Sequence, residues 1–222
     1  MQQSILEIKR RLARLLVEKS YREGDFVLAS GRRSDYYFDC RVTALHAEGS
    51  WLIGTLFNDL LKDVPVVGVG GMTMGADPLV SATTAISHEL GRPLNGLLVR
   101  KEAKDHGEGG NTVGAPIKGH VVIIDDVISA GTSVGESVKI IEACGAHPSG
   151  VLLALDRMEC AGTAEKVADR SAVEDVKERY GMPVVAIADL SDLMSFLKET
   201  KDPDLSAYQE AIFEYRRQYG SK

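Results

Sequence analysis

One segment constrains the fold of this chain more than any other: an apolar run that ends in two aspartates and then passes into a helix. The segment runs from Val121 to Ser133 and reads VVIIDDVISAGTS. Such a run, bounded by turn residues, is typical of a strand that is buried on both faces. In an open α/β sheet, ligands bind where such strands end and helices begin. The segment therefore predicts a binding site at the edge of a parallel sheet.

The second half of this segment is suited to hold a phosphate group. A helix N-terminus offers unpaired backbone N–H groups and a partial positive charge. Ser129, Thr132 and Ser133 add hydroxyl donors. Gly131 lets the backbone approach an anion closely, because it has no side chain. These features predict a cradle for a terminal phosphate.

Asp125 and Asp126 suit a different part of the same ligand. Carboxylates beside a phosphate cradle can accept hydrogen bonds from ribose hydroxyls and can orient a hydrated Mg²⁺. The plainer interpretation is that one aspartate only caps the turn. The complete order of strand, two aspartates, small residues and helix is more specific than the pair alone, and it favours the ligand site.

The rest of the chain alternates between apolar runs and segments with helical spacing of apolar residues. The runs predict strands at 66–69, 97–99, 121–124, 151–155 and 184–187. Helices are expected at 5–16, 48–62, 77–90, 132–143, 164–180, 190–197 and 205–215, and a β-hairpin is expected to join 26–28 to 36–38. Continuous apolar strands between helices imply an α/β fold, with a mainly parallel central sheet and helices on both faces.

Size, charge and cysteine content exclude several classes of protein. With 222 residues the chain is long enough for one α/β domain, and its net charge is −6. An acidic chain argues against a nucleic-acid partner, because such binding depends on neutralising phosphates with Lys and Arg. The chain has no apolar run that is long enough for a membrane span or a signal peptide. The three scattered cysteines indicate free thiols in a reducing compartment, so we expect a cytoplasmic protein without a membrane partner.

The segment from Arg100 to Gly119 interrupts the alternation. It is rich in glycine and lysine and has few apolar residues. A loop of this length inside a compact domain usually has a function. Its composition predicts a mobile lid that carries cations and closes over a ligand. The plainer alternative is a solvated, charged loop.

The chain does not contain two other common phosphate-binding motifs. A Walker loop requires Gly-Lys followed by Ser or Thr, and the chain has no Gly-Lys pair. The segment from Gly68 to Thr73 approaches the dinucleotide fingerprint, but Thr73 stands where the third glycine is needed. A nicotinamide-dependent enzyme is therefore not expected.

Together these segments resemble the orotate phosphoribosyltransferases, within the type I phosphoribosyltransferase family. That family's motif is an apolar strand, two acidic residues and a Gly-Thr turn, as at 121–133. The sequence RKEAKDHGEGG at 100–110 resembles the family's catalytic loop, and 30–39 resembles its orotate-side hairpin. The resemblance implies a single domain over 1–222 with the type I fold. It also implies a small N-terminal hood with a β-hairpin at about 1–45, with C-terminal contributions, and a flexible loop at about 100–119.

The resemblance implies an enzyme that transfers the phosphoribosyl group from phosphoribosyl pyrophosphate (PRPP) to orotate. The products would be orotidine 5′-monophosphate and pyrophosphate, in de novo pyrimidine biosynthesis. Mg²⁺ would be the cofactor, held mainly by substrate and water near Asp125 and Asp126. The enzyme would be a homodimer in which each catalytic loop reaches the neighbouring site.

The resemblance also assigns residues. The implied catalytic residues are Lys104, His106, Asp125 and Asp126. Those implied to bind PRPP or pyrophosphate are Thr73, Arg100, Lys101, Lys104, His106, Asp125, Asp126, Val127, Ile128, Ser129, Ala130, Gly131, Thr132 and Ser133. Those implied to bind orotate are Tyr37, Phe38, Ser129 and Arg157. Arg157 would pair with the orotate carboxylate. The plainer alternatives are strand packing for one of the two aromatics, a surface ion pair for Arg157 and a solvated position for His106.

The sequence departs from the family pattern in two places. Many bacterial relatives have lysine where this chain has Ala29, and a Tyr-Lys pair where it has Thr73 and Met74. We consider Arg32 or Arg33 as a hypothetical replacement for these lysines. Backbone groups at 70–73 can still receive pyrophosphate, because glycines allow close approach.

Two other functions remain as alternatives. A purine-base phosphoribosyltransferase would not need Arg157 for a substrate carboxylate. A non-catalytic regulator with the same fold, sensing a nucleotide, could dispense with the cationic lid.

Overall fold

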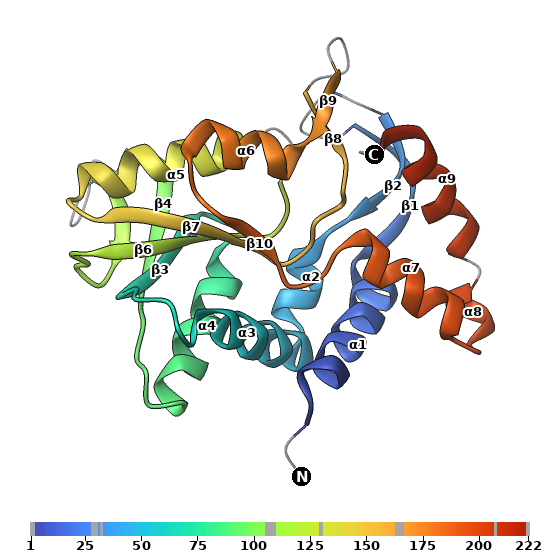
Figure 1. The fold of residues 1–222 in the computed structure, drawn as a ribbon, viewed down its shortest axis with the longest axis horizontal. Helices are drawn as coiled ribbons and strands as arrows, with labels where there is room; N and C mark the ends of the chain where they lie inside the picture. Colours follow the sequence, from blue (N-terminus) through green and yellow to red (C-terminus); the bar gives the residue numbers. More distant parts are fainter. Residues whose placement is uncertain are drawn as a thin grey trace.

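The computed structural model describes residues 3–27, 31, 33–104, 110–128, 131–162, 167–206 and 208–220. Within them, the central sheet has six strands in the order β10-β7-β6-β3-β4-β5 (Figure 1). Its parallel strands are β3 (Gly68–Met72), β4 (Asn95–Lys104), β6 (His120–Asp125), β7 (His147–Leu153) and β10 (Val184–Ala186). The edge strand β5 (Gly110–Gly114) runs antiparallel to β4. The mainly parallel sheet expected from the sequence is confirmed.

Helices cover both faces of this sheet (Figure 1). One face packs against α3 (Ala47–Leu61) and α4 (Asp77–Glu89), the other against α5 (Thr132–Ala143) and α6 (Ala172–Tyr180). Successive residues of β6 point to opposite faces. Val122 and Ile124 join the core under α4, whereas Val121 and Ile123 join the core under α5. This alternation explains why the strand is apolar at every position.

The N-terminal part forms a helix and a separate hairpin. Helix α1 (Ile5–Leu15) begins where Ser4 accepts a hydrogen bond from the backbone of Glu7, and it continues into the π-helical segment η1 (Leu16–Ser20). Strands β1 (Tyr21–Val27) and β2 (Arg33–Phe38) then pair antiparallel, as the sequence predicts. The short helix α2 (Cys40–Leu45) follows at once, and Asp39 caps it.

An aromatic cluster joins this hairpin to the C-terminal part. The rings of Tyr21, Tyr36 and Phe38 lie 5.3 to 5.5 Å apart between centroids. Tyr208 stacks on Tyr21 at 4.8 Å. Helix α9 (Gln209–Tyr219) lies beside the hairpin, whereas α7 (Leu190–Glu199) packs against α1 and is followed by the short α8 (Pro203–Ser206) (Figure 1).

The helix predicted at 164–180 is wrong in its first half. Strands β8 (Cys160–Gly162) and β9 (Val167–Ser171) pair antiparallel before α6 begins. Ser171 and Glu174 form a capping box, because each side chain bonds the backbone N–H of the other, at 3.0 and 2.8 Å. This cap fixes the start of α6 at Ala172.

The uninterrupted loop predicted at 100–119 is also wrong. Within it, residues 100–104 belong to strand β4 and residues 110–114 form β5, and these two strands pair antiparallel at the sheet edge. Residues 105–109, at its tip, lie outside the described residues. Strand β3 begins at Gly68, later than expected, and continues to Met72. Its extension beyond Val69 passes through two glycines, which carry no apolar signal. Among the described helices, none has the length and apolar character needed to cross a membrane.

We expect Phe57→Ala to lower the free energy of unfolding by about 3–5 kcal/mol, because it leaves a void in the core into which α3 packs. Phe57 is fully buried in this core. Urea unfolding at one fixed protein concentration measures the change. Leu6→Ala, at an exposed position of α1, is the control, with an expected change below about 0.5 kcal/mol. Equal losses in the two variants would contradict this description of the core.

Candidate active site

A cavity of about 800 Å³ opens where β3 and β6 end, beside the N-terminal hairpin. Its walls come from segments that are far apart in the chain. Among the residues that the sequence singled out, it is lined by Tyr37, Thr73, Lys101, Asp125, Asp126, Val127, Gly131, Thr132, Ser133 and Arg157. The structure therefore brings the candidate phosphate cradle, one lid residue and two candidate orotate residues into one site.

Other candidate residues lie elsewhere. The ring of Phe38 is fully buried in the aromatic cluster, so strand packing accounts for it. Ile128 is buried against the core under α5. Arg100 lies on β4 outside the cavity lining, near enough to Asp77 for its charge to act on that carboxyl. His106, Ser129, Ala130 and the side chain of Lys104 lie outside the described residues.

The candidate phosphate cradle has an open helix N-terminus. Gly131 precedes α5 with a φ of 68°, in the left-handed region that favours glycine. A Cβ at this position would lie 2.6 Å from the side chain of Val176. Within the described residues, no side chain caps the first turn of α5. Its backbone N–H groups are therefore available to an anion.

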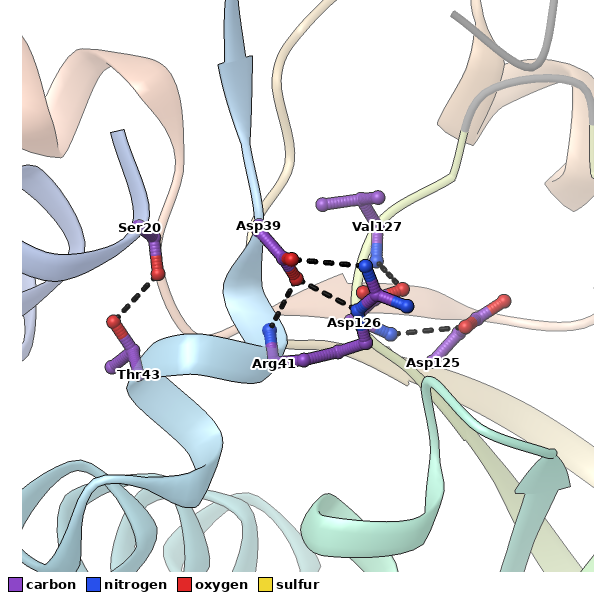
Figure 2. Close-up of polar contacts among 7 residues, drawn as sticks. All are labelled: Ser20, Asp39, Arg41, Thr43, Asp125, Asp126 and Val127. Carbon is purple, nitrogen blue, oxygen red and sulfur yellow. Dashed lines mark hydrogen bonds and ion pairs between the residues drawn. The ribbon is translucent and has the colours of Figure 1, made fainter. Parts of the chain in front are cut away.

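The two aspartates are held in different ways. Asp125 accepts hydrogen bonds from the Ser133 hydroxyl at 2.7 Å and from the Asp126 backbone N–H at 3.0 Å. Asp126 accepts one from the Val127 backbone N–H at 2.9 Å (Figure 2). Burial and the neighbouring charge of Asp126 raise the pKa of Asp125 to about 7. Burial also raises the pKa of Asp126.

These carboxylates fit a hard cation only in part. Oxygen ligands are what Mg²⁺ prefers, and it usually keeps several waters and substrate oxygens in its shell. Among the described residues, no group of three or more His, Cys, Asp or Glu side chains could hold a metal by itself. Asp125 and Asp126 can therefore contribute to a metal site that the substrate and water complete.

The orotate end of the cavity contains an aromatic ring and a buried ion pair. Tyr37 packs on Phe26 with centroids 5.7 Å apart, and burial raises the pKa of its hydroxyl. Arg157 lies 3.1 Å from Glu159, and both side chains are at most 3% exposed. The ion pair that the sequence offered as an alternative for Arg157 thus exists, but it is buried and Arg157 still lines the cavity.

The described end of the lid supplies one cation to the cavity. Lys101 lies 3.5 Å from Glu136 of α5, and its side chain is 63% exposed. Such an exposed pair contributes little to stability, so the ammonium group can leave it for a bound anion. Lys101 lines the cavity of its own chain.

Sequence reasoning missed several residues of this site. Phe26, Val27, Arg41 and Gly75 line the cavity, although no motif contains them. Of these four residues, only Arg41 could have been suspected from the sequence, because it follows the hairpin motif at 30–39 by two residues. Arg33, considered above as a replacement cation, pairs with Asp25, is largely exposed and lies outside the cavity lining.

A parallel sheet with two aspartates at the end of a central strand, followed by an open helix N-terminus, defines the type I phosphoribosyltransferase fold. No family model matches the chain. Over 202 residues the chain is 48% identical to an orotate phosphoribosyltransferase of Cupriavidus necator, with 89% of this chain and 87% of that protein covered. It is 44% identical over 220 residues to that of Ralstonia pickettii, with 96% of each covered. The chain belongs to the orotate phosphoribosyltransferase family.

A solved structure agrees with these sequences. Orotate phosphoribosyltransferase of Mycobacterium tuberculosis H37Rv, in complex with PRPP, is 30% identical to this chain, with a TM-score of 0.64. The match covers 84% of this chain and 98% of that one. The fold class and the family expected from the sequence are both confirmed.

The raised pKa of Asp125 predicts a pH dependence of the ligand-free protein. A folded-state pKa of about 7, above the usual value of about 4, favours the protonated carboxyl. The resulting stabilisation is complete below about pH 4 and is lost as the pH rises through about 7. We expect the free energy of unfolding to fall less steeply over this range in Asp125→Asn than in the wild type. Urea unfolding from pH 5 to 8 measures both slopes. Asp63→Asn, which removes an exposed carboxylate, is the control, and a wild-type slope in Asp125→Asn would refute the assignment.

Proposed function

We propose that this protein is an orotate phosphoribosyltransferase, which converts orotate and PRPP to orotidine 5′-monophosphate and pyrophosphate. One observation carries the proposal: a single cavity contains the aspartate pair, the open helix N-terminus, a lid lysine and Arg157. The bond from the anomeric carbon to the pyrophosphate oxygen would break, with its electron pair leaving on pyrophosphate. A nitrogen of orotate would bond to the same carbon and lose its proton to water. The chain would contribute mainly positioning and electrostatics to this step.

Each wall of the cavity has a proposed role. Residues 129–133 bind the 5′-phosphate, and Asp125 and Asp126 accept hydrogen bonds from the ribose hydroxyls. Arg157, oriented by Glu159, pairs with the orotate carboxylate beside the ring of Tyr37. Thr73 and the glycines before it contact pyrophosphate with backbone groups.

The proposed cofactor is Mg²⁺, supported by the partial oxygen site at Asp125 and Asp126. The cation would neutralise charge on the pyrophosphate group of PRPP. Asp126 would orient the ribose and the hydrated cation together, since its carboxylate lines the cavity.

The proposed assembly is a homodimer in which the lid residues Arg100, Lys104 and His106 serve the neighbouring site. The position of Arg100 outside this chain's own cavity supports that arrangement. We also propose that the chain is one domain with the hairpin and α9 as a hood over the cavity. The three free cysteines support a cytoplasmic location, because such thiols persist in reducing compartments.

The alternatives differ in what they require of Arg157 and the lid. A purine base has no carboxylate to pair with Arg157, which nevertheless lines this cavity. A nucleotide sensor without catalysis has no need of the cationic lid sequence. Both features favour catalysis on orotate.

We expect purified protein to consume orotate only when PRPP and Mg²⁺ are both present. Lys104→Ala should lower kcat by about a hundredfold or more, because a preplaced cation no longer stabilises the departing pyrophosphate. The ultraviolet absorbance of orotate measures the reaction, and Lys62→Ala, at the C-terminal end of α3 and outside the cavity lining, is the control. Turnover of adenine, hypoxanthine or guanine instead of orotate would support the purine alternative.

The shared lid can be tested by mixing two inactive variants. Lys104→Ala lacks the lid cation, and Asp126→Asn lacks a ribose contact. If the lid acts across a twofold interface, random mixed dimers leave about a quarter of the sites intact. Co-expression should then restore about a quarter of wild-type activity. Activity no higher than that of either variant alone would show that each lid serves its own chain.

A further inference from the structure

Arg41 lies on the wall of the cavity, but the roles proposed so far leave it unused. It is the second residue of α2, immediately after the hairpin, and it lines the cavity together with Thr73 and Gly75. The inference that follows rests on the proposed function, because it concerns how the same site holds PRPP.

Asp39 fixes the orientation of the Arg41 guanidinium group. Nε of Arg41 donates to one carboxylate oxygen at 2.7 Å, and Nη2 donates to the other at 2.9 Å. The Arg41 backbone N–H also donates to Asp39, at 3.2 Å. Nη1 makes no hydrogen bond with any residue that the structure describes. One edge of the guanidinium is therefore held by protein, and its remaining N–H groups are available to a ligand.

Arg41 lies near both Tyr37 and Asp126, at the side of the cavity that adjoins the turn where pyrophosphate is expected. Its guanidinium extends from α2 toward Asp126 (Figure 2), and the two charges interact. Asp126 in turn lies next to the turn after β3, since a Cβ on Gly75 would be 3.1 Å from its carboxylate. Arg41, Asp126 and Gly75 thus share one end of the cavity.

The turn at 73–75, which reads Thr-Met-Gly, supplies no cation to this end of the cavity. The side chain of Met74 is 69% exposed and lies outside the cavity lining. Among the described residues of that lining, the other cations are Lys101 and Arg157, which pair with Glu136 and Glu159. Arg41 lies close to Asp126, which adjoins this turn.

We propose that Arg41 binds the pyrophosphate group of PRPP and that Asp39 is its positioning residue. A guanidinium forms charge-assisted hydrogen bonds with phosphate oxygens, and fixing it in advance reduces the entropy lost on binding. If Arg41 instead served only to join the hairpin to α2, its loss would affect the binding of both substrates equally.

The reverse reaction tests this assignment, with orotidine 5′-monophosphate and inorganic pyrophosphate as substrates. Arg41→Gln should raise the KM for pyrophosphate about tenfold or more, as expected for the loss of a hydrogen bond from a charged donor. The KM for orotidine 5′-monophosphate should stay at its wild-type value. The control is Arg14→Gln, which removes an arginine paired with Glu18 on the surface of α1 and should change neither constant.

A rescue separates binding from a structural role. The double variant Arg41→Gln/Met74→Lys should recover most of the lost pyrophosphate affinity, because the lysine restores a cation to the same end of the cavity. Asp39→Asn should raise only the KM for pyrophosphate, by less than Arg41→Gln does. If Arg41→Gln does not fold, Arg41→Lys keeps the charge without the fork and should raise the same constant several-fold.

The outcomes distinguish this inference from the proposed function. Wild-type turnover with an unchanged KM for pyrophosphate in Arg41→Gln overturns only the role of Arg41. An equal rise in both Michaelis constants without rescue by lysine at position 74 also overturns it, because it indicates a structural role. No interconversion of the four reactants by the wild type overturns both.

Discussion

The carboxylate of Asp125 joins the end of β6 to the start of α5, and the geometry of the site depends on this connection. One oxygen accepts from Ser133 in the helix, and the other accepts from the backbone of Asp126. The group is buried, so a displacement would leave polar atoms without partners, at a cost of about 1–3 kcal/mol each. The candidate phosphate cradle and the carboxylate of Asp126 are therefore fixed relative to each other before any ligand arrives.

The sheet makes this connection rigid. Strand β6 lies between β3 and β7, so its backbone is hydrogen-bonded on both sides. Its side chains alternate between two apolar cores, and a shift of one residue would exchange every one of them. The register of β6 thus determines that Asp125 is the buried aspartate and Asp126 the more exposed one.

Much of this fold could be predicted from the sequence, because buried parallel strands are apolar at every position. The segment at 121–124 and the helix at 132–143 show this signal, and the structure has both. Polar strands lack it. Strand β9 was mistaken for helix because its charged residues continue smoothly into α6. The Ser171 and Glu174 capping pair was a readable signal of the true helix start.

The site was predictable where its residues are consecutive and not where tertiary contacts assemble it. The segment at 125–133 carries its own pattern, so its described part was found as a unit. Arg41, Phe26 and Val27 reach the cavity only because the hairpin packs over the end of the sheet. Phe38 shows the reverse error, since strand alternation directs its ring into the aromatic cluster while Tyr37 faces the cavity.

The cations of this site differ in how firmly the protein holds them, and that difference suits the separate roles proposed for them. Arg157 and Glu159 form a buried pair, and separating buried partners leaves an uncompensated charge. The guanidinium of Arg157 is therefore a fixed feature of the cavity wall. Lys101 and Glu136 form an exposed pair, which costs little to separate. Arg41 is intermediate, since Asp39 holds one edge and leaves the other available.

How firmly each of these cations is held depends on the position of its residue in the fold. A base has to be held in one orientation, which requires a rigid partner at the end of a buried strand. A leaving group has to be bound and then released, which favours cations on an edge hairpin that can exchange partners. Arg157 follows the inner strand β7, whereas Lys101 lies on β4 next to the edge strand β5. The positions of these strands in the sheet therefore explain why Arg157 is held firmly and Lys101 is not.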